Sequence, residues 1–265
     1  MSSDDVQYAD LPGVRIAYRL DGEAGAPVLV LSNSLGTTLR MWDAQMAAFT
    51  RHFRVLRYDT RGHGRSGRPP GAYEMATLGG DVLALLDALD IDRADFCGLS
   101  MGGVTGIWLA SRAAQRFGKV VLCNTAAKIG NEQTWNARIA AVRAGGVASV
   151  TDAVLERWFT APFRAAQPEA VAAVRDMLVA TDAEGYCANS AAIRDMDLRA
   201  DLPGIALPTL VVGGSADGSV APAETRALAE AIPNARYVEL LAAHMSNIEA
   251  ADEFNAAVLA FLRGR

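Results

Sequence analysis

Short apolar runs alternate with helical patterns along much of this chain, and that alternation restricts its fold more than any other feature. Six runs have the continuous apolar character of strands buried on both faces. Strands that alternate with helices imply crossover connections, so we predict an α/β fold with a mostly parallel central sheet flanked by helices. The runs are Pro27–Leu31, Phe53–Tyr58, Asp95–Leu99, Lys119–Cys123, Thr209–Val212 and Arg236–Leu240, and the helical patterns are Leu78–Leu89, Gly102–Phe117, Pro222–Ile232 and Ala251–Leu262.

Two stretches depart from this alternation. Near the start, Val14–Tyr18 follows a Pro-Gly turn and is expected to pair antiparallel with a segment around Val6–Ala9. Residues 126–200 are rich in alanine and arginine and helical in pattern, and their glycines and prolines divide them into about four helices. We therefore predict a single domain over residues 1–265, with a core formed by 1–125 and 201–265 and an inserted helical cap formed by 126–200.

The overall composition restricts the partners of the protein. With 30 acidic against 25 basic residues the net charge is -5, which argues against nucleic acid as a ligand. The polar, acidic start does not resemble a signal peptide, and no run approaches the ~20 apolar residues of a membrane span. The three cysteines form no CxxC pair, so we expect a cytoplasmic protein with reduced thiols and neither metal nor cofactor. The oligomeric state is left open.

The segment Gly98-Leu-Ser-Met-Gly-Gly103 carries the strongest chemical signal. It has the form G-x-S-x-G, it follows a predicted strand, and it opens a predicted helix. A serine on such a tight turn is presented above the sheet edge, and side chains at Gly98 or Gly102 would collide with the turn. We predict that Ser100 is a nucleophile and that the amide of Met101 is free to stabilise an oxyanion.

A serine nucleophile needs a base and an orienting carboxylate. Of the three histidines, His244 follows the last predicted strand, where α/β active sites assemble, and it is the predicted base. His63 lies in a glycine-rich turn and is expected to stabilise that loop, while His52 is expected to be solvated or to cap a helix. Asp217 follows the strand Thr209–Val212, which completes the order Ser, Asp, His used by G-x-S-x-G hydrolases.

The second oxyanion donor is expected in the loop that follows the first core strand. In this chain that loop reads Leu31-Ser-Asn-Ser-Leu-Gly-Thr37, which assigns the donor to the amide of Leu35. The hydroxyl of Ser34 is a candidate for a further contact with substrate, although it could equally serve only the loop.

Together these segments resemble the α/β-hydrolase superfamily, and more narrowly the 3-oxoadipate enol-lactonases of the β-ketoadipate pathway. The resemblance implies the α/β-hydrolase fold and cofactor-free hydrolysis of 3-oxoadipate enol-lactone, a step in aromatic catabolism, with Ser100, Asp217 and His244 as the triad. The stretches that carry it are Ser32-Asn-Ser-Leu-Gly-Thr37, Leu56-Arg-Tyr-Asp-Thr-Arg-Gly-His-Gly64, Phe96-Cys-Gly-Leu-Ser-Met-Gly-Gly103, Asn124-Thr-Ala-Ala-Lys-Ile-Gly130 with Trp135 and Arg138, and Ala243-His-Met-Ser-Asn-Ile248.

An anionic lactone substrate calls for a cation in the pocket. Trp135 and Arg138 are three residues apart and share one face of a predicted cap helix, so we expect Arg138 to pair with the substrate carboxylate and Trp135 to wall the ring. The alternative is a solvated arginine beside a packed tryptophan. The sequence does not separate Arg138 from the other cap arginines, which are Arg143, Arg157, Arg164, Arg175 and Arg194.

Other functions remain open from the sequence. Another carboxylesterase, a different lactonase or a cofactor-free perhydrolase would use the same triad. A ligand-binding receptor on the same fold is a further alternative, which the ordered serine, aspartate and histidine disfavour.

Overall fold

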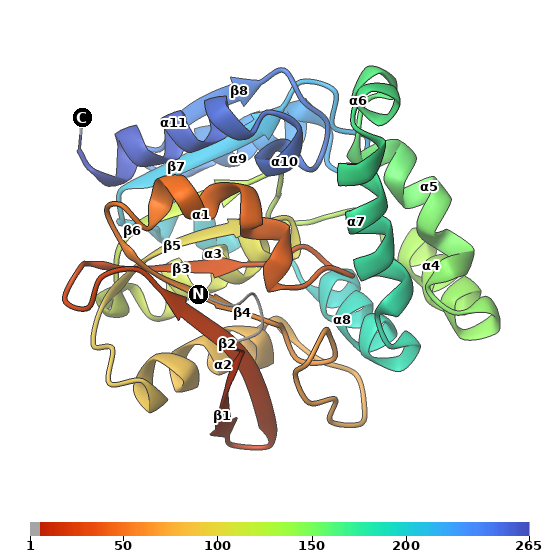
Figure 1. Cartoon of the computed structure of the whole chain (residues 1–265), viewed down its shortest axis with the longest axis horizontal. Helices are drawn as coiled ribbons and strands as arrows, with labels where there is room; N and C mark the ends of the chain where they lie inside the picture. Colours follow the sequence, from red (N-terminus) through yellow and green to blue (C-terminus); the bar gives the residue numbers. More distant parts are fainter. Residues whose placement is uncertain (1–5, 265) are drawn as a thin grey trace.

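An eight-stranded sheet forms the centre of the protein in the computed structural model, which describes residues 6–264 (Figure 1). The strand order is β1-β2-β4-β3-β5-β6-β7-β8; β1 and β2 run antiparallel to their neighbours, and all later pairs are parallel. This confirms the predicted fold class. The strands are β1 (Gln7–Leu11), β2 (Val14–Asp21), β3 (Val28–Ser32), β4 (Arg54–Tyr58), β5 (Ala94–Leu99), β6 (Phe117–Cys123), β7 (Thr209–Gly214) and β8 (Arg236–Leu240).

The hairpin at the start of the chain pairs as the sequence predicts, with Leu11 opposite Val14. Gly13 in its turn has a φ of 79°, a left-handed conformation that glycine adopts without strain. Residues 1–5, which include part of the polar start considered above, lie outside the described residues, as does residue 265.

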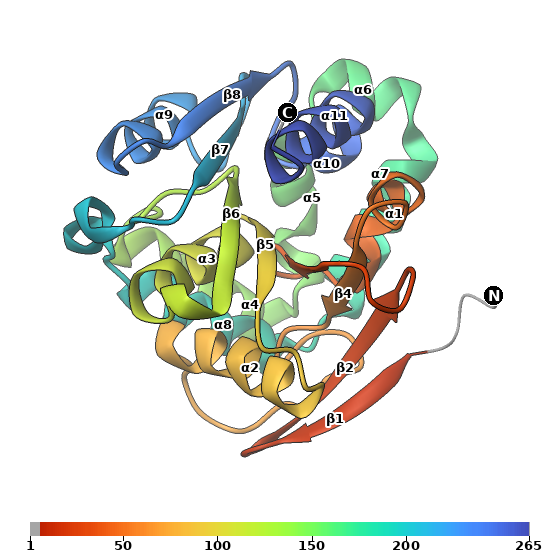
Figure 2. The ribbon, with the colours of Figure 1, turned by 90° about the vertical axis from the view of Figure 1, so that its left-hand side faces the viewer.

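Helices cover both faces of the sheet (Figure 2). The 3-10 turn η1 (Leu39–Trp42), α1 (Asp43–Phe49), α10 (Ser246–Glu249) and α11 (Ala251–Leu262) lie on one face. The other face carries α2 (Met75–Ala88), α3 (Met101–Arg112) and α9 (Pro222–Ala231). No helix within residues 6–264 has the length and apolar character that crossing a membrane requires.

The predicted helix Gly102–Phe117 is wrong at its C-terminal end. The helix ends at Arg112, where Ala113 adopts a non-helical φ of -140°, and a 3-10 turn η2 (Ala114–Arg116) leads directly into β6. Phe117 is fully buried as the first residue of that strand. Phe117 continues the helical spacing of apolar residues but belongs to the next strand. Periodicity alone cannot tell the end of a helix from the start of a buried strand.

Five helices, where about four were predicted, lie between β6 and β7 and gather on one side of the sheet (Figure 1). The additional helix boundary falls at Thr181 and Asp182. The sequence has neither glycine nor proline at these two positions to indicate it. The Asp182 carboxylate accepts a hydrogen bond of 2.9 Å from the amide of Gly185 and so caps a new helix. The helices are α4 (Glu132–Gly145), α5 (Ala148–Trp158), α6 (Ala161–Ala166), α7 (Pro168–Ala180) and α8 (Ala183–Asp195), and η3 (Arg199–Gly204) precedes β7.

Candidate active site

Ser100 stands at the tight turn between β5 and α3. Its backbone has φ 57° and ψ -114°, a conformation that non-glycine residues rarely adopt. A Cβ atom on Gly98 would lie 2.1 Å from the carbonyl oxygen of Gly102, and one on Gly102 would lie 2.1 Å from that of Ser32. Both glycines are therefore required for β5, the turn and α3 to approach one another this closely.

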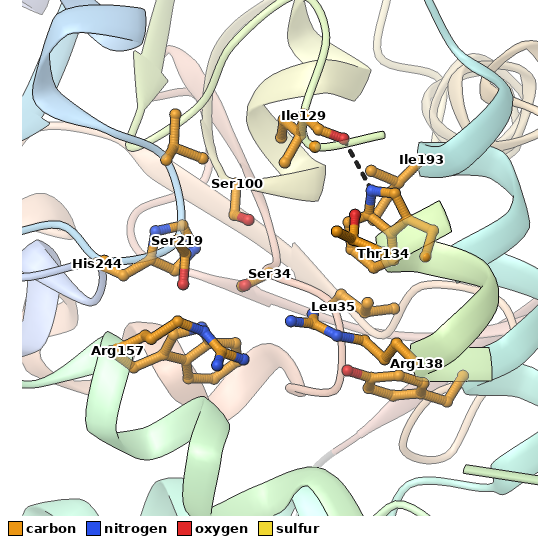
Figure 3. Close-up of a pocket in the computed structure, with 16 residues that line it drawn as sticks. Ser34, Leu35, Ser100, Ile129, Thr134, Arg138, Arg157, Ile193, Ser219 and His244 are labelled. Carbon is orange, nitrogen blue, oxygen red and sulfur yellow. Dashed lines mark hydrogen bonds between the residues drawn. The ribbon is translucent and has the colours of Figure 1, made fainter. Parts of the chain in front are cut away.

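Hydrogen bonds from the neighbouring strand hold this strained residue in place. The Ser100 amide donates to the carbonyl of Cys123 over 2.9 Å, and the Thr125 hydroxyl donates to the Ser100 carbonyl over 2.8 Å. The side chain is then left as the free part of the residue, and it faces a cavity (Figure 3).

His244 and Asp217 form a buried pair at the ends of β8 and β7. The His244 Nδ1 atom lies 2.8 Å and 3.0 Å from the two carboxylate oxygens of Asp217. The amides of Ser219 and Val220 donate to Oδ1, and the Asn124 side chain donates to Oδ2. Burial raises the pKa of Asp217, but attraction to His244 and these hydrogen bonds outweigh burial and lower it below its usual value. Asp217 is therefore an ionised acceptor aimed at the imidazole.

Asn124 is a supporting residue for which the sequence analysis assigned no role. It follows β6 with a φ of 48°, and its Nδ2 donates to Asp217 over 3.0 Å and to the carbonyl of Ala243 over 3.2 Å. Its amide orientation is fixed because the Ser246 hydroxyl donates to Oδ1 over 2.6 Å. Asn124 thus links the acid to the loop that carries the histidine.

A cavity that is partly open to solvent brings these groups together (Figure 3). Ser100, His244, Ser34 and Leu35 line it beside residues of the cap helices. Within the described chain, no hydrogen bond joins the Ser100 hydroxyl to His244. Such contacts are often loose without substrate and tighten in the reacting complex.

The loop after β3 presents free hydrogen-bond donors to this cavity. Within residues 6–264, the amides of Leu35 and Met101 donate to no protein acceptor. The Ser34 hydroxyl is also buried without a partner there, and it points into the cavity (Figure 3). The loop is held rigidly, because Trp42 donates to the Asn33 side chain over 2.9 Å.

His63 has the loop-stabilising position predicted for it. The amide of Gly36, next to Leu35, donates to His63 Nε2 over 2.8 Å. The ring proton therefore resides on Nδ1, which lies 3.3 Å from the carbonyl of Arg61. Burial lowers the pKa of His63 to about 4, so the ring remains a neutral acceptor.

This buried neutral histidine makes stability depend on pH. Below pH ~6.5 the unfolded chain gains a proton that the folded chain takes up only near pH 4, so stability is lost as the pH falls through this window. Between pH 7.5 and 5, His63 should account for a loss of about 2 kcal/mol in the free energy of unfolding. Urea unfolding at both pH values measures this decrease in the free energy of unfolding. In His63→Gln, which keeps an acceptor for the Gly36 amide, the decrease should be smaller by the share that His63 contributes.

A pH dependence in His63→Gln equal to that of the wild type would contradict the assignment.

Two arginines line the cavity from the cap helices. Arg138, for which the sequence predicts a contact with the substrate carboxylate, has its guanidinium carbon 4.8 Å from the ring centroid of Trp135. Trp135 also lines the cavity, and it is packed: it is 7% exposed and its indole N–H donates to the carbonyl of Ile129 over 2.8 Å. The second is Arg157. Three of the other cap arginines hold groups elsewhere: Arg164 donates to the carbonyls of Glu156 and Phe159, and Arg175 and Arg194 pair with Asp152 and Asp195.

The part of the chain that the structure describes contains no cluster of three or more His, Cys, Asp or Glu side chains suited to a metal ion. The expectation of a cofactor-free protein stays a prediction.

A serine on a strand-to-helix elbow, with its histidine and acid supplied by later strands of the same sheet, is the arrangement used by serine hydrolases of the α/β-hydrolase fold. Residues 27–145 match the family model for that fold. The chain is 43% identical over 250 residues to 3-oxoadipate enol-lactonase 2 of Acinetobacter baylyi, which covers 94% of each chain. It thus belongs to the α/β hydrolases and, within them, to the 3-oxoadipate enol-lactonase family.

Solved structures agree with this assignment. The enol-lactonase from Burkholderia xenovorans LB400 is 53% identical and superposes with a TM-score of 0.96, covering 97% of this chain and 100% of its own. A hydrolase from Pseudomonas aeruginosa PA01 is 48% identical with a TM-score of 0.95, over 98% and 99% of the two chains.

Proposed function

We propose that the protein hydrolyses 3-oxoadipate enol-lactone to 3-oxoadipate, as the names of its relatives suggest. The observation that carries the proposal is the cavity, which joins Ser100 and His244 to a cationic region containing Arg138. An ester carbonyl at Ser100 and a carboxylate at Arg138 can then belong to one small anionic lactone.

The reaction begins with acyl transfer to Ser100. His244 removes the hydroxyl proton as the oxygen attacks the lactone carbonyl, and Asp217 holds the imidazole in the required tautomer. The amides of Leu35 and Met101 stabilise the oxyanion, and a missing donor of this kind typically costs roughly 3–4 kcal/mol. The unpartnered Ser34 hydroxyl supports a third contact at this end of the cavity.

Ring opening then breaks the bond between the carbonyl carbon and the ring oxygen. The ring oxygen leaves as an enolate, which takes up the proton that His244 removed from Ser100 and becomes the ketone. Water activated by His244 attacks the acyl-enzyme, releases Ser100 and leaves a new carboxylate on the product.

The cap residues hold the rest of the substrate in this proposal. Arg138 pairs with the substrate carboxylate. The Arg138 guanidinium stacks on the Trp135 ring, and Trp135 forms the wall of the cavity beside the lactone ring. A core of residues 1–125 and 201–265 would thus supply the reacting groups, while a cap of residues 126–200 would supply substrate recognition.

We also propose that the enzyme works in the cytoplasm. Cys97, Cys123 and Cys187 are all free and buried, and the first two have sulfur atoms 3.9 Å apart without being bonded. Neighbouring thiols that remain reduced suit a reducing compartment.

Side-by-side kinetics test the proposed substrate. The value of kcat/KM for the enol-lactone should exceed that for p-nitrophenyl acetate and butyrate by about 10³-fold or more, because only the lactone brings a carboxylate to Arg138. Better turnover of the simple esters would favour a general carboxylesterase. Failure of a fluorophosphonate to label Ser100 would favour a ligand-binding receptor.

A further inference from the structure

The cavity has a charge opposite to that of the protein. The chain carries a net charge of -5, yet the residues described as lining the cavity include Arg138 and Arg157 and no aspartate or glutamate. Neither arginine forms an ion pair with a carboxylate anywhere in residues 6–264. One substrate carboxylate would neutralise only one of these cations.

Arg157 is fixed next to the proposed catalytic histidine. The amide that follows His244 donates to the carbonyl of Trp158 over 3.0 Å, and the Trp158 ring lies 5.8 Å from the imidazole. The Glu249 carboxylate accepts a hydrogen bond from the amide of Thr160 over 3.2 Å and another from the amide that precedes His244 over 2.9 Å. The C-terminal end of α5 is therefore attached to the histidine loop.

The side chain of Arg157 crosses the loop that carries the acid. A Cβ atom on Gly218 would lie 3.3 Å from Cα, Cβ and Cγ of Arg157, so the missing side chain gives the arginine stem its path. Arg157 approaches from the side of His244 and Arg138 from the side of Thr134, and both guanidinium groups point into the space beside Ser34 (Figure 3).

The two cations are close enough to repel each other. Burial lowers the pKa of Arg157, and the neighbouring charge of Arg138 lowers it further. Like charges that share a partly desolvated cavity are costly unless an anion binds between them. The cavity therefore favours a ligand with more than one negative charge.

We infer that Arg157 forms a second anion subsite, which receives the carboxylate created by hydrolysis while Arg138 keeps the one that the substrate already carries. This inference rests on the proposed function. The lactone has one negative charge, whereas addition of water yields a product with two carboxylates and releases one proton. The paired arginines thus match the charge of the product, a dicarboxylate with six carbons in its chain.

Calorimetric binding of two non-reacting ligands tests this subsite. Adipate carries two carboxylates, and adipamate has the same six-carbon chain with one carboxylate replaced by an amide. At low ionic strength the wild type should bind adipate about tenfold or more tightly than adipamate, because only adipate engages both arginines. Arg157→Gln should reduce this ratio to below about twofold.

Matched variants separate this role from general effects. Arg157→Lys retains the charge and should keep most of the preference for adipate. Arg138→Gln should weaken both ligands and raise KM. Arg143→Gln, an exposed cap arginine outside the cavity, should change neither affinity.

Persistence of the adipate preference in a folded Arg157→Gln variant would overturn the inference while lactone turnover still supported the proposed function. The reverse result is also possible: Arg157→Gln could lose the preference for adipate while the wild-type protein fails to turn over the lactone. The second anion subsite would then be supported and the proposed substrate would be rejected.

Discussion

Ser100→Ala should lower kcat for the enol-lactone by at least about 10⁴-fold, since it removes the atom that is proposed to attack the carbonyl. The fold should be unaffected, because the backbone of the elbow is held by Cys123 and Thr125 through main-chain groups of Ser100. Both arginines and the oxyanion amides remain in the variant. Binding of adipate should therefore stay within about threefold of the wild-type affinity.

Stopped-flow turnover together with calorimetry would measure the two effects separately. Ser219→Ala is a matched control, because its side chain also lines the cavity while the amide that supports Asp217 is retained. That variant should keep kcat within about threefold. Near-normal turnover by Ser100→Ala would eliminate the acyl-enzyme mechanism.

The features predictable from the sequence are those fixed by local constraints. Gly98 and Gly102 mark the elbow because a Cβ at either position would collide with backbone. Ser100, Asp217 and His244 could be placed together because each follows its own parallel strand, and the carboxyl ends of such strands meet at one edge of the sheet.

The features that the sequence left open depend on contacts between distant segments. Arg157 and Arg143 look alike in an arginine-rich stretch, and only the attachment of α5 to the histidine loop directs Arg157 into the cavity. The role of Asn124 likewise arises from a hydrogen bond to a residue 93 positions later. No spacing or composition signal encodes such a contact.

Asp217→Asn should lower kcat by about 10³- to 10⁴-fold. It should also lower the free energy of unfolding by about 1–3 kcal/mol, because the new buried NH₂ has only donors to face. Every group that faces the Asp217 carboxylate in the structure is a donor: the amides of Ser219 and Val220, the Asn124 side chain and the His244 ring. An amide in place of the carboxylate must turn its NH₂ toward some of these donors. At Oδ1 it would face two backbone amides, so the NH₂ is expected at the Oδ2 position.

In that orientation the new NH₂ faces His244 Nδ1, the atom 2.8 Å from Oδ2 in the structure. The ring is then favoured with its proton on Nε2, and an Nε2 that already carries a proton cannot accept one from Ser100. The readout is twofold: kcat, and the downfield proton resonance expected of the Nδ1–H between His244 and Asp217, which should disappear. Asp201→Asn, which alters a surface partner of Arg112, is the control and should change neither. If the resonance vanished while kcat stayed within about tenfold, the imidazole orientation set by Asp217 would be dispensable and His244 could not be the base in the proposed form.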